Sequence, residues 1–347
     1  MARGSERWVS CLVTRRRTVL IDGWYGQLNT GDDAYCAVGA HWALREWGVV
    51  PRFVGRPTSL PLLPEEARGA SPERPLFSGH TRVSHIIHAA RARSVVQLGG
   101  SRFSRALRSH QDLDRLRRLR RLEMLASSIS VGPFKSRSDA RAVGDLLGRF
   151  RFISVRDSAS LDRLVDVAPS AHAHLGFDAA VLLPDVLCVE MPLREVARRR
   201  PVLGVSVCPF ESVGGGDRDL EREATRLRRV QELVARVVDA TGCAVRMLVM
   251  CGHPKWGDEA ASIKMADSLA ARTNVTITRY SRVTADMLWA IAECDAVIGM
   301  RLHASILAYA LGVPFAVASY TSKNDDFAAE LGADPNVCFS SDGPDPH

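Results

Sequence analysis

The stretch Asp295-Ala-Val-Ile-Gly-Met-Arg-Leu-His-Ala304 joins a short apolar segment directly to an arginine and a histidine at the start of a helical pattern. It predicts a buried strand that runs into a helix. In α/β proteins, the gap between a strand end and a helix N-terminus is where anions bind. Arg301 could hold a phosphate or carboxylate with its planar guanidinium, and His303 could move a proton near neutral pH.

The same alternation of apolar segments and helical stretches extends through the rest of the chain. In the first half it predicts strands at 18–21, 49–54, 94–98, 128–131 and 152–155, with helices over 33–47, 80–93, 102–121, 138–150 and 157–165. In the second half it predicts strands at 202–208, 245–250, 275–278, 296–299 and 314–318, a long helix ending near 240, and helices over 258–272, 283–294 and 301–311. This pattern is typical of an α/β fold with two Rossmann-like domains that face each other across a cleft.

Length and composition set the predicted domain organisation. The 347 residues suffice for two domains. We expect an N-terminal extension (1–17), a Rossmann-like domain (18–184), a charged linker with prolines (185–200), a second Rossmann-like domain (201–332) and a C-terminal tail (333–347).

The sequence has no apolar run long enough to span a membrane and no signal-peptide core, which predicts a cytoplasmic protein. The eight cysteines lack metal-site spacing and are predicted to be reduced thiols, with no metal bound.

Much of the net charge of +7 lies in the predicted helix over 102–121, which is rich in arginine. Leucines at 113, 116, 119 and 122 recur every three residues, so one interpretation is an amphipathic helix with a solvated basic face. The alternative is an anionic partner such as lipid head groups, which would make the protein membrane-peripheral, or a polyphosphate. A nucleic-acid partner is not expected, because no aromatic residues alternate with the arginines to stack on bases.

A glycine-rich loop, Gly23-Trp-Tyr-Gly-Gln-Leu-Asn-Thr-Gly-Asp-Asp33, follows the first predicted strand and opens the first predicted helix. Its glycines allow close backbone approach to a ligand, while Asn29 and Asp32 could cap the helix or bind a polar substrate. The spacing matches neither a Walker A loop nor G-x-G-x-x-G, so it does not predict nucleotide binding. Ordinary turn and capping chemistry remains the alternative role.

Two further cations follow predicted strands. Arg156 ends the strand at 152–155 and could point into the cleft, or it could form a surface pair with Asp157. Lys323 lies in the polar segment after the last predicted strand, on the same rim as Arg301. It could meet a bound anion or be a solvated lysine.

Together these segments resemble the polysaccharide pyruvyl transferase family. The resemblance rests on Asp22 to Ala34, Ser154-Val-Arg-Asp157, Ile298-Gly-Met-Arg-Leu-His-Ala304, Gly312-Val-Pro314 and Ser319-Tyr-Thr-Ser-Lys323, in order over about 18 to 332. It implies a GT-B-like pair of Rossmann domains. It also implies transfer of the pyruvyl group of phosphoenolpyruvate to two hydroxyls of a sugar, as a ketal, with release of phosphate.

The resemblance further implies roles for individual residues. The family's functional arginine, histidine and lysine fall on Arg156, His303 and Lys323. Arg301 and Leu302 of the R-L-H motif join Arg156 and Lys323 in the implied phosphoenolpyruvate site, on the side of the C-terminal domain. The N-terminal domain is the implied acceptor side, and its predicted acceptor-binding residues are Asp22, Tyr25, Asn29 and Asp32.

The implied chemistry needs cations for the phosphate and carboxylate of the donor, and a group that moves protons, for which His303 is the candidate. No step needs a metal or cofactor, and phosphoenolpyruvate is a substrate. The acceptor could be a lipid-linked unit, a cell-wall glycan or another glycoside. Two alternatives stay open, namely a nucleotide-sugar-dependent GT-B glycosyltransferase and a non-enzymatic anion-binding or membrane-peripheral scaffold.

Overall fold

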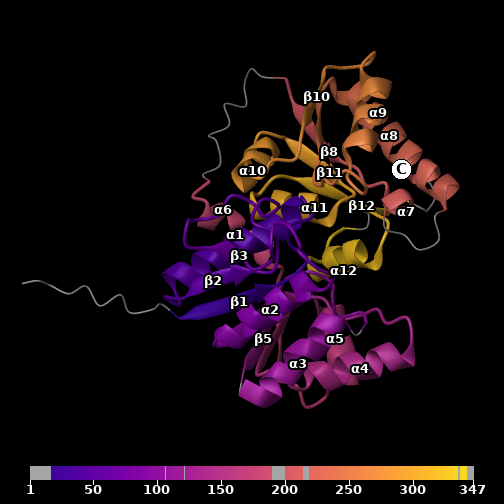
Figure 1. Ribbon diagram of the computed structural model, residues 1–347. Coiled ribbons are helices and arrows are strands. Elements are labelled where there is room, and N and C mark those ends of the chain that lie inside the picture. The colour runs from indigo at the N-terminus through magenta and orange to yellow at the C-terminus, as the bar shows by residue number, and fades with distance from the viewer. Residues whose placement is uncertain are drawn as a thin grey trace, which may run out of the picture.

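The computed structural model describes residues 17–105, 107–120, 122–189, 200–213, 219–334 and 337–341, and two parallel sheets organise them (Figure 1). The N-terminal sheet has the strand order β3-β2-β1-β4-β5-β6-β7. Its strands are β1 (Thr18–Asp22), β2 (Val50–Phe53), β3 (Arg68–Gly69), β4 (Ser94–Leu98), β5 (Glu123–Ile129), β6 (Phe152–Val155) and β7 (Ala173–Leu175). Its helices are α1 (Thr30–Arg45), α2 (His80–Arg91), α3 (Arg108–Arg120), α4 (Arg137–Leu147) and α5 (Ser158–Val167).

The C-terminal sheet has the order β10-β9-β8-β11-β12-β13. Its strands are β8 (Val202–Ser206), β9 (Ala244–Leu248), β10 (Val275–Thr278), β11 (Ala296–Gly299), β12 (Phe315–Ser319) and β13 (Cys338–Ser340). Its helices are α7 (Phe210–Val213), α8 (Leu220–Thr241), α9 (Glu259–Leu269), α10 (Thr284–Ala292), α11 (Leu302–Ala310) and α12 (Ser322–Glu330). A short 3-10 helix η1 (Ala179–Leu182) and α6 (Leu183–Val186) lead from the first sheet toward the second. The prediction of two Rossmann-like halves is therefore confirmed.

Several predicted elements need correction. β5 covers Glu123–Ile129 and not 128–131, and α3 begins at Arg108 and not at 102. The polar segment after β12 forms helix α12, which the sequence analysis did not predict. The short strands β3, β7 and β13 were also missed, and β13 lies within the predicted C-terminal tail. Residues 1–16 and 190–199, which hold most of the predicted extension and linker, lie outside the described residues, as do 335–336 and 342–347 of the tail.

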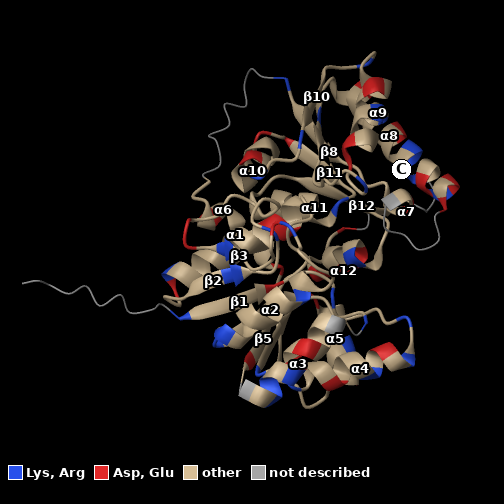
Figure 2. Ribbon diagram, in the orientation of Figure 1, with Lys and Arg blue, Asp and Glu red and all other residues tan. Residues whose placement is uncertain are grey.

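The arginine-rich segment forms α3, whose charges are interspersed with acidic groups (Figure 2). Asp114 pairs with Arg117, Arg118 and Arg149, and Asp112 pairs with Arg82. Leu113 is buried but Leu119 is 81% exposed, since a three-residue spacing drifts around a helix of 3.6 residues per turn. The helix therefore buries part of the predicted leucine stripe. Arg121 and the side chains of Arg108 and Arg120 lie outside the described part of the chain.

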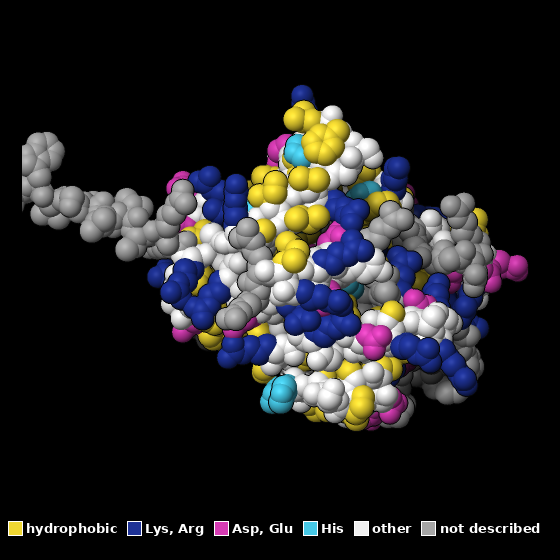
Figure 3. Space-filling view, turned by 60° about the horizontal axis from the view of Figure 1, so that its bottom comes forward, with side chains coloured by type: hydrophobic (Ala, Val, Ile, Leu, Met, Phe, Trp, Pro, Cys, Tyr) yellow, Lys and Arg dark blue, Asp and Glu magenta, His cyan; other side chains and the backbone are white. Residues whose placement is uncertain are grey.

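Basic side chains spread over the face of the molecule seen in Figure 3, with acidic groups and hydrophobic side chains among them. No helix in the described ranges is both long and apolar enough to cross a bilayer. Contact of α3 with a membrane surface stays a prediction.

The two halves share one apolar core. A single cluster of buried side chains includes Ile21 and Tyr35 from the N-terminal half and Leu288 and Leu307 from the C-terminal half. Helix α1 packs against α10 and α11, and α5 packs against α12, so these helices lie where the halves meet (Figure 1). Burial of a side chain such as leucine contributes roughly 1.5–3 kcal/mol, so this shared core holds the halves together.

Main-chain hydrogen bonds also join the halves, along a seam between the glycine-rich loop and the segment after β9. The amide of Thr30 donates to the carbonyl of Met250 (2.9 Å), and the amide of Gly252 donates to the carbonyl of Leu28 (2.8 Å). Asn29 and Cys251 form an isolated antiparallel bridge between these bonds. The first loop of the N-terminal sheet is thus fixed to the second sheet by its backbone.

Candidate functional site

The stretch that opens the sequence analysis forms β11, a short turn and α11, as expected. Arg301 occupies the N-cap position of α11, and His303 lies in the first turn of the helix. No side chain caps the N-terminus of α11, nor that of the neighbouring α12, which carries Lys323. Two helix N-termini with amide groups that no side chain satisfies therefore approach the same region, and such ends favour anions.

His303 contacts the N-terminal half through Tyr35, a buried residue of α1. Its Nε2 lies 3.1 Å from the Tyr35 hydroxyl, which donates to Oδ2 of Asp178 at 2.6 Å. Because an ionised carboxylate can only accept, the tyrosine oxygen is left to accept from Nε2–H, and this places the imidazole lone pair on Nδ1. The ring is packed tightly against α1, and a Cβ atom added to Gly31 would lie 2.1 Å from Nδ1.

The environment of His303 favours the neutral imidazole. Burial lowers the pKa of His303 to about 4. The positive charges of Arg156, Lys323 and Arg301 add to this shift, and the negative charge of Asp178 opposes it. The ring is therefore a proton acceptor at neutral pH. A dianionic or trianionic ligand bound among the three cations would remove part of this penalty and favour the imidazolium.

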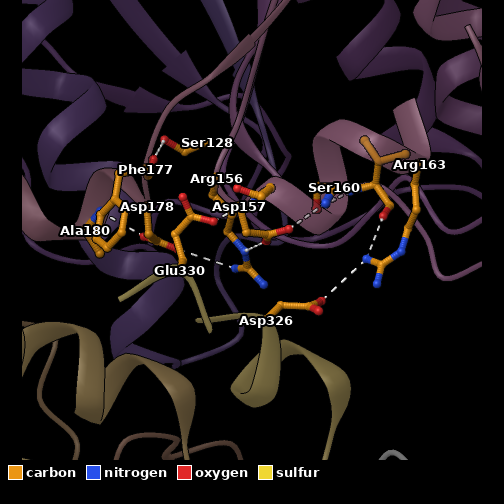
Figure 4. A network of polar contacts seen from close by, with 12 residues as sticks. Ser128, Arg156, Asp157, Ser160, Arg163, Phe177, Asp178, Ala180, Asp326 and Glu330 are labelled. Atoms are coloured by element: carbon orange, nitrogen blue, oxygen red, sulfur yellow. Dashed lines mark hydrogen bonds and ion pairs between the residues drawn. The ribbon is translucent and has the colours of Figure 1, made fainter. Parts of the chain in front are cut away.

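Arg156 follows β6 and is buried, so the predicted alternative of a surface pair with Asp157 is wrong. Its Nε lies 3.4 Å from Asp157 Oδ2 and its Nη1 lies 3.4 Å from Asp178 Oδ2 (Figure 4). Asp157 is held in turn because its Oδ1 caps α5, accepting from the amide of Ser160 at 2.7 Å. The guanidinium thus belongs to the same buried network as Tyr35 and Asp178.

Lys323 comes from α12 and makes no hydrogen bond or ion pair with any described residue. Its side chain is exposed to solvent, which agrees with the predicted alternative of a solvated lysine. Partial loss of hydration and the nearby charges of Arg156 and Arg301 lower its pKa to about 8, while Asp32 acts in the opposite direction. This ammonium is positioned among like charges without a partner of its own.

Contacts between α5 and α12 fix the helix that carries Lys323. Glu330 accepts from the amide of Ser158 at 2.8 Å, and Arg163 lies 3.4 Å from Asp326 (Figure 4). Both acidic residues belong to α12, and both partners belong to α5, which Arg156 and Asp157 precede. The two cations from opposite halves are therefore held by one pair of helices.

Arg301 is not a free cation, because it forms an ion pair with Asp258. Its Nε lies 2.9 and 3.0 Å from the two carboxylate oxygens, and its Nη2 donates to the carbonyl of Trp256 at 3.3 Å. The Asp258 side chain is fully buried. Arg301 nevertheless contributes positive charge near His303 and Lys323, and Leu302 begins α11 between Arg301 and His303.

The end of the glycine-rich loop lies beside the same cations. Asn29 caps α1, accepting from the amide of Gly31 at 3.2 Å and donating to Asp32 at 2.7 Å. Burial raises the pKa of Asp32 to about 7, although Asn29, Lys323 and Arg301 oppose this shift. Burial also raises the pKa of Asp33 to about 8, and Tyr280 of the C-terminal half donates to this carboxyl at 2.6 Å.

The other two predicted acceptor residues lie at the beginning of this loop. Asp22 ends β1, and it pairs with Arg102 and accepts from Gln97 at 2.7 Å. Tyr25 is buried, and its hydroxyl donates to the carbonyl of Leu98 at 2.7 Å. The structure therefore separates the predicted residues into two groups, with Asn29 and Asp32 near His303 and with Asp22 and Tyr25 beside a neighbouring cavity.

Sequence reasoning missed Tyr35, Asp178 and Asp258, each of which contacts a predicted site residue. Tyr35 is hidden inside a helical pattern, and it meets Asp178 across 143 residues of sequence. Asp178 lies between β7 and η1, where it also caps η1 by accepting from the amide of Ala180. Among the described residues, no group of three or more His, Cys, Asp or Glu side chains is arranged to hold a metal ion.

Solved structures similar to this chain share its architecture. UDP-GlcNAc 2-epimerase from Methanocaldococcus jannaschii aligns over 94% of this chain and 89% of its own, at 10% identity, with a TM-score of 0.59. UDP-GlcNAc 2-epimerase from Neisseria meningitidis gives a TM-score of 0.57 at 10% identity, over 90% of this chain and 85% of its own. S. aureus MnaA gives 0.56 at 12% identity, over 95% and 92%. At these identities the likeness establishes the GT-B type of fold alone.

No curated protein matches this chain in sequence. The profile of the polysaccharide pyruvyl transferase family does match, over residues 29–322. This span begins at the helix cap of α1 and ends at the start of α12, so it contains Tyr35, Arg156, Asp178 and His303. Because the match covers most of the chain, this protein belongs to the polysaccharide pyruvyl transferase family.

Proposed function

We propose that this protein transfers the pyruvyl group of phosphoenolpyruvate to two hydroxyls of a sugar-containing acceptor, forming a cyclic ketal and releasing phosphate. The observation that carries the proposal is Lys323, an ammonium without a partner among the described residues that lies close to Arg156, Arg301 and the neutral His303. Like charges gathered in this way repel one another, and a bound anion would relieve the repulsion. Membership of the family makes the pyruvyl donor the anion to consider first.

The donor carries a phosphate and a carboxylate, and the site supplies matching groups. Lys323 and Arg156 provide charge from opposite halves, and the amides at the N-termini of α11 and α12 provide neutral donors. Arg301 adds positive charge to the site, although it is already paired with Asp258. Leu302 supplies an amide in the first turn of α11.

The reaction requires two proton transfers that balance. The first sugar hydroxyl adds to C2 and passes its proton to His303, which delivers that proton to the C3 methylene of phosphoenolpyruvate. The bond between C2 and the phosphate oxygen then breaks, the second hydroxyl attacks C2, and its proton leaves with the phosphate. His303 carries protons in these steps, a contribution of about 100- to 10,000-fold in rate for general acid–base catalysis.

Tyr35 and Asp178 hold His303 in the state that the first step needs. The chain of hydrogen bonds keeps the proton on Nε2, so that Nδ1 can accept a proton from a hydroxyl. When the imidazolium forms, Asp178 lies 4.0 Å from Nε2 and stabilises the new charge. Asn29 and Asp32, at the N-terminus of α1, then orient the acceptor hydroxyls.

The test is a transfer assay read by mass spectrometry. The protein is incubated with phosphoenolpyruvate and a panel of free, nucleotide-linked and lipid-linked saccharides, and each is examined for a pyruvyl ketal together with released phosphate. We expect the ketal with wild-type protein and its loss with His303→Gln, while the melting temperature changes little. Wild-type turnover in purified His303→Gln would remove His303 from the chemistry.

A second experiment distinguishes the proposed function from the alternative, a nucleotide-sugar glycosyltransferase of the same fold. We expect phosphoenolpyruvate to raise the melting temperature of the wild type and to do so less in Lys323→Met. Stabilisation by UDP- or GDP-sugars, with none by phosphoenolpyruvate, would contradict the proposed donor. Lipid-linked members of the acceptor panel also test the membrane-peripheral role considered for α3.

A further inference from the structure

A surface cavity of about 570 Å³ lies beside the glycine-rich loop and includes residues of both halves. This volume falls within the roughly 300–1,000 Å³ typical of small-molecule sites. Its walls come from the loop itself, from the segments after β2, β4 and β9, and from α2 and α3. The lining groups that carry the argument are Asp22, Trp24, Arg56, His85, Arg102 and Ser109.

Asp22 and Arg102 give the cavity both acceptors and donors. Each oxygen of Asp22 accepts one hydrogen bond from the protein, from Arg102 or from Gln97, and a carboxylate has about four acceptor positions. The guanidinium of Arg102 also donates to Ser109 at 3.1 Å. Its Nε is buried and meets no acceptor among the described residues, so a ligand would reach this guanidinium through its Nη groups.

The cavity lining carries charges of both signs. Burial alone would raise the pKa of Asp22, but Arg102 and the hydrogen bond from Gln97 outweigh it and hold the pKa below its usual value. Asp22 therefore stays ionised opposite Arg102, and Arg56 adds a second guanidinium to the lining. Burial lowers the pKa of His85, and burial with Lys255 lowers that of His253, so both rings are neutral at pH 7. A ligand with hydroxyls, which both donate and accept hydrogen bonds, suits this mixed lining.

Trp24 adds an apolar surface to this polar cavity. Its indole is 57% exposed, although large aromatic side chains are usually buried where they have no partner. An exposed indole ring beside hydrogen-bond donors and acceptors suits a sugar ligand. A sugar ring has an apolar C–H face for the indole, and each of its hydroxyls can both donate and accept.

We propose that this cavity binds one uncharged sugar ring of the acceptor, with the face of the ring on Trp24 and its hydroxyls bonded to Asp22 and Arg102. The assignment rests on the proposed function only in naming the ring as part of the acceptor. The position fits, because the loop that forms the cavity wall continues into Asn29 and Gly31, and Gly31 touches His303. The sugar that receives the pyruvyl group would lie next along the loop.

The experiment follows the indole Nε1–H signals of the six tryptophans in ¹⁵N-labelled full-length protein. The probes are methyl glycosides of glucose, galactose and mannose, for which we expect a dissociation constant of about 1 mM given their size. Trp24→Phe identifies the Trp24 signal. We expect at least one glycoside to shift this signal saturably, and Asp22→Asn to weaken that binding about tenfold.

Matched variants separate specific binding from general effects. Trp289→Phe removes another exposed indole, on α10, and should leave glycoside binding unchanged. Ser109→Ala is the second test of the polar wall if Asp22→Asn does not fold, and it should weaken binding through loss of the partner of Arg102.

Three results would overturn the proposal. They are no saturable shift at Trp24 with any glycoside, a shift caused by inorganic phosphate and not by glycosides, or binding that is unaffected by a folded Asp22→Asn or Ser109→Ala variant. The measurement contains no phosphoenolpyruvate and does not need His303. Its failure therefore leaves the transfer assay unaffected, and the reverse also holds.

Discussion

The hydroxyl of Tyr35 lies 3.1 Å from Nε2 of His303, so a helix of the N-terminal half supports the proposed proton carrier of the C-terminal half. The same hydroxyl donates to Asp178, which also contacts Arg156. Arg156, Asp178, Tyr35 and His303 thus belong to one network that both halves build.

Replacing Tyr35 with phenylalanine should lower the rate of transfer on the order of 10- to 100-fold, because His303 loses the partner that holds the proton on Nε2. The pH dependence of kcat should shift as well, which a purely structural role would not cause. Steady-state kinetics across pH provide the measurement. Tyr309→Phe, on the same helix as His303, is the control, and an unchanged pH profile in Tyr35→Phe would argue against the network.

Gly31→Ala should abolish transfer with only a small loss of stability. The added Cβ would lie 2.1 Å from Nδ1 of His303, so the imidazole must turn away. Alanine is favoured over glycine in a helix by about 1 kcal/mol, which offsets part of the strain. Transfer assays and urea unfolding test both parts. Gly148→Ala, where the nearest atom lies at 3.4 Å, should stay active, and an active Gly31→Ala would show that the ring position is not critical.

Asp33→Asn should stabilise the protein increasingly as the pH rises from 5 to 9. The pKa of Asp33 is raised from its usual value of 3.8 to about 8, so the folded state holds a proton that the unfolded state releases. The wild type therefore loses stability over this range, by several kcal/mol at most, and asparagine removes that loss. Urea unfolding at both pH values measures it, with Asp267→Asn on α9 as the control. A constant difference between variant and wild type would contradict the raised pKa.

For Lys323, kcat/KM for phosphoenolpyruvate should fall as the pH rises through about 8, because the ammonium loses its proton there. Lys323→Arg should not show this fall in kcat/KM through pH 8, since a guanidinium stays charged. Initial rates at low donor concentration give this quantity for the free enzyme. Parallel pH profiles for the two proteins would place the titrating group elsewhere, with Asp32 the first to examine.

The sequence predicted most of the fold because the signals were local. β4, β6, β10 and β11 begin and end where the apolar segments do. The errors arose where a local signal was misleading or too short. β5 mixes apolar and polar residues, and β3 has only two residues. α12 is a polar helix whose contacts with α5 come from the other half.

The candidate site was predictable only in part, for the same reason. Arg156, His303 and Lys323 lie near one another as the strand ends suggested, although their catalytic roles stay predictions. Arg301 has a partner, Asp258, that lies 43 residues away, and Tyr35 looked like an ordinary helix residue. Pairings across such separations leave no trace in a single sequence, because neither residue changes the pattern around it.

The seam at Leu28, Thr30, Met250 and Gly252 has a consequence for variation among relatives of this protein. Its hydrogen bonds join main-chain atoms, so substitution of these side chains does not by itself remove them. The lining of the cavity at one end of the loop can then vary while the register between the loop and the C-terminal sheet persists. If the cavity holds part of the acceptor as proposed, acceptor preference can diverge in this way without moving the N-termini of α11 and α12.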